Sequence, residues 1–199
     1  MFSKRRELFN LRLLEDIKLG RVDEDIIDIL LMFNNLEEYY TTSSCSGRIT
    51  IHKGKVYEDK RKHVILLKMH EPPKENELTD CLIEVLREHG FVWLKVSGFI
   101  IHVITDCLEN AIAFAKLVRC CGIKDICIRP IGNNEWLIVL KSPHNLSTPL
   151  SIDVLDSQYV NILVKETVKL LRMVKIEIKL FKLCLTELIS AMKKLSYYD

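Results

Sequence analysis

Residues 39 to 49, YYTTSSCSGRI, place five hydroxyl side chains around one cysteine, just ahead of a glycine and an arginine. Short hydroxyl side chains donate and accept hydrogen bonds in tight turns, and Gly47 permits a positive φ that lets successive N–H groups point the same way. Arg48 adds a forked cation. The sequence therefore predicts a turn over 41–48 that binds a carboxylate or a phosphate. A turn that merely caps a strand through its own backbone bonds explains the composition equally well.

Other candidate site residues are a cysteine, two histidines and a tryptophan. A nucleophilic Cys45 would need an adjacent base, and the sequence shows no Cys/His signature, so covalent use of this thiol is disfavoured. His70 and His102 lie at or near the ends of predicted strands, where site residues are often displayed, although a lone strand histidine is commonly just packed and hydrogen-bonded. Trp93 lies on the strand that precedes His102.

A second signal is a set of six basic residues near the C-terminus, spaced by 4, 3, 3, 4 and 3. On a helix, at ~100° per residue, this spacing puts all six within roughly 140° of one face. RNA phosphates would neutralise such a face, whereas a solvated face that keeps the protein soluble fits equally well and an anionic membrane surface fits less well. The six residues are Lys165, Lys169, Arg172, Lys175, Lys179 and Lys182.

Composition and motifs exclude several classes of protein. The chain has 199 residues, a net charge of +2 and seven cysteines without a CxxC pair, which favours one cytoplasmic domain without a disulfide framework or a metal site. No run approaches the ~18 apolar residues of a membrane helix. No two of the seven glycines are separated by one residue or by four residues, so neither GxGxxG nor GxxxxGK[ST] occurs. Rossmann dinucleotide sites and P-loops are therefore excluded at the level of motifs.

The elements that must position these residues follow from periodicity and from helix stop signals. Two N-terminal helices (1–36, with Asp23 as the second N-cap), an α+β core (37–155) and a C-terminal helix (156–199, with Ser157 as N-cap) are predicted within a single domain, 1–199. The strand endings LLKMH and FIIHV are each followed by a helix and a glycine, which suggests a duplicated unit. The core elements predicted are strands 48–52, 63–70 (buried), 91–96, 99–105, 126–129, 136–140 and 150–155, with helices 74–89 and 108–121.

With these residues in place, the opening segment resembles the TTSSC[SA]GRI motif of the methyltransferase family that acts third in wybutosine synthesis. Further similarities occur in the same order along the chain: the Trp93 strand, the stretch from Phe99 to Val103 that contains His102, the sequence IVLKSPHNLSTPL at 138–150, and Tyr159 near the start of the last helix. The resemblance covers about residues 22–190.

The resemblance implies methyl transfer from S-adenosylmethionine to a ring nitrogen of a tricyclic guanosine derivative next to the anticodon of tRNA(Phe). It also implies a fold that is not the Rossmann fold, built from a duplicated unit of three strands and one helix. The corresponding rivals are a non-catalytic tRNA-binding module and a thiol-dependent hydrolase or phosphatase that would depend on Cys45.

Under this resemblance each candidate residue has an expected role. His102, with His70 as the second choice, would orient the base or take up the proton that N-methylation releases. Tyr40 and Trp93 would stack on flat rings, and the six basic residues would hold the tRNA backbone. A carboxylate of the cofactor or a phosphate of the substrate would lie on Ser43, Ser44, Cys45, Ser46, Gly47 and Arg48.

Overall fold

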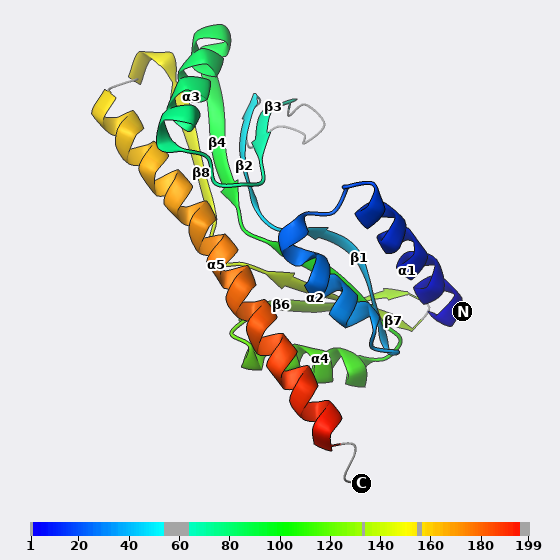
Figure 1. Cartoon of the computed structure of the whole chain (residues 1–199). Coiled ribbons are helices and arrows are strands. Elements are labelled where there is room, and N and C mark those ends of the chain that lie inside the picture. Colours follow the sequence, from blue (N-terminus) through cyan, green and yellow to red (C-terminus); the bar gives the residue numbers. More distant parts are fainter. Residues whose placement is uncertain (1, 54–63, 133, 155–156, 196–199) are drawn as a thin grey trace. The chain divides into compact units, whose positions relative to one another are not determined.

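The computed structural model (Figure 1) describes residues 2–53, 64–132, 134–154 and 157–195. Parts of four predicted elements lie outside these ranges: His63 and Leu155 at the ends of predicted strands, residue 1 of the N-terminal helices, and residues 156 and 196–199 of the C-terminal helix. The chain divides into two compact units, which are described separately below. Unit 1 comprises residues 1–46, 99–142 and 176–199, and unit 2 comprises residues 47–98 and 143–175.

Unit 1 is built on an antiparallel sheet, sheet A, with the strand order β1-β5-β7-β6. Its elements are α1 (Phe2–Lys18), α2 (Glu24–Asn34), β1 (Tyr39–Cys45), β5 (Ile100–Thr105), α4 (Leu108–Cys120), β6 (Asp125–Gly132), β7 (Glu135–Lys141) and the second part of α5 (Ser157–Leu195).

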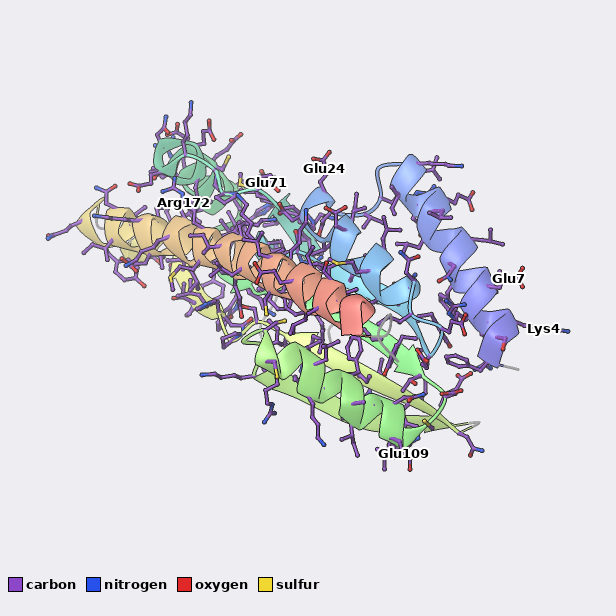
Figure 2. The ribbon with its side chains drawn as sticks, turned by 60° about the horizontal axis from the view of Figure 1, so that its bottom comes forward. Lys4, Glu7, Glu24, Glu71, Glu109 and Arg172 are labelled. Carbon is purple, nitrogen blue, oxygen red and sulfur yellow. The ribbon has the colours of Figure 1, made fainter. Side chains whose placement is uncertain are left out.

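The two faces of sheet A are covered differently. On one face α4 packs against β5 and β7, and Phe114 of α4 contacts Phe33 edge-on at 4.7 Å between ring centroids. On the other face α1 places Phe2 and Phe9 against Tyr40. Lys4 and Glu7 project away from α1, as Figure 2 shows. Because α1 reaches only part of its face, the rest of that face is left to polar side chains.

Unit 2 is built on a second antiparallel sheet, sheet B, with the strand order β3-β2-β4-β8. Leu78, Leu82 and Leu86 of α3 are fully buried, and α3 packs against β4 (Figure 1). The elements are β2 (Arg48–Lys53), β3 (Val64–Met69), α3 (Glu75–His89), β4 (Phe91–Ser97), β8 (Leu146–Ser151), the 3₁₀ turn η2 (Ile152–Val154) and the first part of α5.

The two units share one topology, read from opposite ends of the chain. Reading unit 2 from its C-terminal end gives β4-α3-β3-β2, which matches β5-α4-β6-β7 of unit 1 element by element. The fourth strand is β8 in unit 2 and β1 in unit 1. The predicted α+β class, the N-terminal helices and the long C-terminal helix are confirmed. Strand pairing is antiparallel in both sheets, unlike the parallel sheet of a Rossmann fold.

Two local predictions were wrong. The strand beginning near residue 63 was expected to be buried, but β3 is the edge strand of sheet B and Val64 and Ile65 are 56% and 55% exposed. The strand expected at 150–155 lies earlier, at Leu146–Ser151, because its pairing with β4 carries it back to Leu146. Asp23 is the N-cap residue of α2, as predicted, although its side chain makes no capping hydrogen bond.

Candidate active site

The segment that was predicted to form an anion-binding turn is mostly a strand. Thr41 to Cys45 belong to β1, which pairs with β5 over Tyr39–Cys45, and only Ser46 and Gly47 separate β1 from β2. The backbone amide of Thr41 donates to Asn34 Oδ1 at 2.7 Å, which ties the strand to α2. Hydroxyl side chains are compatible with a strand, so composition alone did not distinguish the two structures.

A β-bulge in β1 places two of these hydroxyl residues opposite His102. Thr41 pairs with Val103 and Ser44 pairs with Ile101, so the two residues between them, Thr42 and Ser43, face the single residue between Val103 and Ile101. Two residues opposite one is the geometry of a β-bulge, a feature enriched beside active sites. Thr42 and Ser43 are both exposed. The structure therefore brings together Ser43 and His102, which the sequence had selected independently.

Two cations that sequence reasoning missed lie near His102. Arg129 of β6 and Lys141 of β7, together with burial, which is the largest cause, lower the pKa of His102 below its ordinary value of 6.5. The imidazole is half-buried and neutral at pH 7, so one ring nitrogen can accept a proton.

The strand register arranges this surface in three rows. Directly paired residues of antiparallel strands point to the same side, so His102, Val139 and Cys127 form the middle row. The row with Ile104 and Leu137 ends in Arg129, and the row with Ile100 and Lys141 ends in Asp125. We call Thr42, Ser43, His102, Asp125, Cys127, Arg129 and Lys141 the His102 face.

Two neighbouring candidates occupy different positions on the same side of sheet A. Cys45 pairs with Ile100 and is half-buried. Tyr40 is only 1% exposed and stacks on Phe9 with 5.1 Å between ring centroids. The structure gives Tyr40 a packing role, because Phe2 and Phe9 cover its ring.

Ser46 and Gly47 are explained by packing. Ser46 is fully buried, and its backbone amide donates to Asp23 Oδ2 at 2.7 Å. Gly47 has a φ of +91°, as predicted, and a Cβ there would lie 2.8 Å from Val174 Cγ1 and 3.0 Å from Ser97 O. Only glycine fits this close approach, so the glycine in the motif has a structural cause that does not involve a ligand.

In unit 2 a second polar surface surrounds Trp93. On β4 the buried residues Val92 and Leu94 alternate with Phe91, Trp93 and Lys95, which point to the other side. Pairing adds Arg48 opposite Ser97, and Lys68 and Thr50 in the row of Lys95. We call Arg48, Lys68, Phe91, Trp93, Lys95 and Ser97 the Trp93 face. His70, half-buried after β3, also belongs to unit 2.

Trp93 is half-buried, and its ring meets Phe91 edge-on at 6.3 Å. Phe91 is 42% exposed. Among the described residues, none accepts a hydrogen bond from the buried Nε1 of Trp93. An indole and a phenyl ring flanked by cations suit stacking on the bases of a single-stranded nucleic acid.

The six predicted RNA-binding cations of α5 are not equivalent. Lys175 is only 7% exposed, and its ammonium lies 3.3 Å from Glu71 Oε1 in unit 2. In unit 1, Lys182 forms an ion pair with Asp28. These two residues lie at the edge of the apolar side of the helix, because the basic spacing drifts toward that side over several turns.

The other four cations are exposed, and two of them have acidic neighbours. Lys169 lies 3.5 Å from Glu166, one turn away. Lys165 lines a groove of about 450 Å³ in unit 2 together with Glu75 and Asp80 of α3. Arg172, labelled in Figure 2, and Lys179 are exposed and make no ion pair with a described carboxylate.

The fold and the His102 face define a non-Rossmann α+β protein with a half-buried imidazole beside small hydroxyl side chains. Comparison with known families identifies the family within this class. The family model described as Methyltransferase TYW3 matches residues 3–187, and the chain belongs to this methyltransferase family. Membership implies a methyl donor and confirms the resemblance found in the sequence.

Archaeal relatives carry a consistent name. A protein of Thermococcus sibiricus is 32% identical over 77% of this chain and 79% of its own length, and one of Pyrococcus furiosus is 33% identical over 90% and 88%. Both are named tRNA(Phe) 7-((3-amino-3-carboxypropyl)-4-demethylwyosine(37)-N(4))-methyltransferase, the second with the suffix 1.

Solved structures support the fold. The PH1069 protein of Pyrococcus horikoshii has a TM-score of 0.79 and 29% identity, covering 91% of this chain and 94% of its own. A hypothetical protein of Aeropyrum pernix has a TM-score of 0.67 and 24% identity, over 84% and 99%. Among the described residues, none of the helices combines the length and apolar character needed to cross a membrane.

Proposed function

We propose that this chain is a tRNA N-methyltransferase that transfers a methyl group from S-adenosylmethionine to a wyosine-type guanosine next to the anticodon of tRNA(Phe), in the cytoplasm. Its family and the names of its relatives support the reaction and the substrate. The observation that carries the site is the neutral His102 opposite the exposed Thr42–Ser43 bulge.

The donor set of the His102 face fits the methyl donor. S-adenosylmethionine has ribose hydroxyls and an amino-acid carboxylate, and the exposed hydroxyls of Thr42 and Ser43 can hydrogen-bond to either group. When bound, it supplies a methyl carbon on a positively charged sulfur. We assign Ser43 to holding the donor. Ser44, which was expected to join it, pairs with the buried Ile101, so its side chain lies on the opposite face of sheet A.

The protein's contribution is alignment and proton transfer. Bound S-adenosylmethionine would supply the methyl group to the ring nitrogen of the base, and Thr42 and Ser43 would hold the donor in position. The nitrogen then sheds a proton, which neutral His102 accepts. Burial, and after it the positive charges of Arg129 and Lys141, lower the pKa of His102 and so favour the neutral imidazole beforehand.

We assign the tRNA contacts to the Trp93 face, with exposed Arg172 and Lys179 as further phosphate contacts. Trp93 and Phe91 offer stacking surfaces, and Lys95 and Lys68 are exposed cations in the same face. Bases next to an anticodon are unpaired, and RNA-binding proteins commonly hold such bases by stacking.

Two measurements test this function in sequence. Calorimetry should show saturable binding of S-adenosylmethionine, and mass spectrometry should show one added methyl group on tRNA(Phe) that carries the 4-demethylwyosine-type base. The matched control is the same tRNA with unmodified guanosine, which should gain nothing. Binding of tRNA with neither S-adenosylmethionine binding nor methyl transfer would instead establish a non-catalytic tRNA-binding module.

A further inference from the structure

Beyond His102 and the bulge, the His102 face carries two cations and a carboxylate that the mechanism above does not use for binding. Arg129, Lys141 and Asp125 are all exposed. Neither cation forms an ion pair with a carboxylate in the described parts of the chain. Two exposed cations with one carboxylate beside them leave a net positive charge on this part of the face, which attracts an anionic group.

The register defines the spacing of these three groups. Asp125 pairs directly with Lys141, so a carboxylate and an ammonium lie side by side on neighbouring strands. Arg129 lies four residues from Asp125 on β6, about 13 Å along the strand. Cys127 and Val139 lie between them, in the row that starts at His102. The long side chains of Arg129 and Lys141 can therefore approach one ligand from opposite sides of the row.

We propose that Arg129, Lys141 and Asp125 form a subsite for an amino-acid zwitterion: the two cations take the carboxylate and Asp125 takes the ammonium. The subsite rests on the proposed function and names a recognition element for it. Charged hydrogen bonds to a carboxylate are strong and directional, and a guanidinium can make two at once. A phosphate would suit the cations but would be repelled by Asp125, so the mixed charge favours a zwitterion.

Two ligands of the proposed reaction carry this chemistry. S-adenosylmethionine ends in an α-amino acid, and the substrate in the relatives' name carries a 3-amino-3-carboxypropyl chain. Both present a carboxylate and an ammonium on one carbon. The experiment must therefore separate the cofactor's amino acid from the substrate's chain.

The variants are Arg129→Gln, Lys141→Gln and Asp125→Asn, and all three positions are exposed, so the fold should tolerate them. Matched controls are Arg119→Gln and Lys116→Gln, exposed positions of α4, the helix that packs on the opposite face of sheet A. Equilibrium binding is measured by calorimetry for S-adenosylmethionine. Filter binding is used for two tRNAs, with and without the 3-amino-3-carboxypropyl chain on 4-demethylwyosine.

If the subsite holds the substrate's chain, each variant should weaken binding of the chain-bearing tRNA by about 10-fold or more and leave the chain-free tRNA unchanged. If it holds the cofactor's amino acid, each variant should weaken S-adenosylmethionine by a similar factor, and both tRNAs should bind as before. The α4 controls should change none of the three affinities.

The subsite is overturned if the three variants leave all affinities unchanged, or if they weaken both tRNAs equally, since that indicates general phosphate contact. It is also overturned if Asp125→Asn strengthens binding, because the carboxylate then only opposes an anion. Failure of the proposed function is a different result: the unaltered protein would methylate neither tRNA.

Discussion

Sheets A and B are both four-stranded and antiparallel, but their polar faces differ in chemistry. The His102 face offers an imidazole, two exposed hydroxyls and a mixture of positive and negative charge. The Trp93 face offers an indole, a phenyl ring and cations. The first set can accept a proton and the second can stack on bases, which is why we propose that sheet A carries the reaction and sheet B the recognition of tRNA.

Backbone detail accounts for part of this difference. The bulge of sheet A lies in β1 and displays Thr42 and Ser43 opposite the histidine. The irregularity of sheet B lies between β2 and the edge strand β3, where the side chains include the apolar Leu66 and Leu67. An extra residue changes the direction of side chains only locally, so its effect on a site depends on which residue of the partner strand lies opposite it. In sheet A the partner presents His102.

Replacing His102 should give the largest effect. In His102→Gln the side chain keeps its polarity but loses its basic nitrogen, so single-turnover methyl transfer should fall about 10²–10⁴-fold. Affinity for tRNA should stay the same, because the substitution leaves the Trp93 face intact. An unchanged rate would remove His102 from the mechanism and with it the assignment of reaction to sheet A.

The pH dependence is the control for this variant. The pKa of His102 is lowered below 6.5, so the imidazole stays neutral as the pH falls past that value and is protonated only at lower pH. The rate of the unaltered protein should therefore be level through neutral pH and fall as the pH drops through the lowered pKa. His102→Gln should lack this acid limb. An acid limb that persists in the variant would belong to another group.

Trp93→Ala should give the next largest effect, on affinity. Loss of one stacking surface costs about 1–3 kcal/mol, or about 5–150-fold in the dissociation constant of tRNA. The rate at saturating tRNA should change little. Trp93→Phe is the matched control, because it keeps a flat ring and removes the Nε1 that has no described acceptor. If Trp93→Ala lowered the saturated rate and left the affinity intact, the roles of the two faces would be reversed.

Gly47→Ala tests whether the two sheets form independently. Both Gly47→Ala and the control Gly20→Ala place alanine at positive φ, +91° and +64° respectively, but no heavy atom lies within 4 Å of a Cβ at Gly20. The clash with Val174 and Ser97 should make Gly47→Ala the costlier by about 1–3 kcal/mol of unfolding free energy. Hydrogen exchange should speed up in β2 and β4 more than in β5 and β7. Equal acceleration in both sheets would contradict independent stability.

The sequence predicted the elements well where the signal was local. Helical periodicity and the glycines after three helices located α1, α3 and α4, and Gly20, Gly90 and Gly122 all have positive φ. The burial of β3 was predicted wrongly. Its continuous apolar run is typical of a buried strand, but burial depends on neighbouring strands, and β3 lies at the edge of sheet B.

The site was predicted only in part, because its geometry depends on pairing between distant strands. Ser43 and His102 were chosen separately, and only the register shift of β1 shows that they meet. Arg129 and Asp125 were missed, although their alternation with Ile126 and Ile128 on β6 is visible in the sequence. No local pattern states that β7 inserts between β5 and β6 and thereby brings Arg129 to the side of His102.

The smallest expected effect is on the salt dependence of tRNA binding. It should differ between the exposed cations of the Trp93 face and the buried cation of α5, Lys175. Binding of single-stranded RNA weakens with salt by a logarithmic slope of about 0.7 per neutralised phosphate. Lys95→Gln should therefore reduce the slope by about that amount. Lys175→Gln should leave the slope unchanged and lower stability instead, because this ammonium is 7% exposed and paired with Glu71. If Lys175→Gln reduces the slope as much as Lys95→Gln, the buried flank of α5 opens to tRNA, and recognition is not confined to exposed cations such as those of the Trp93 face.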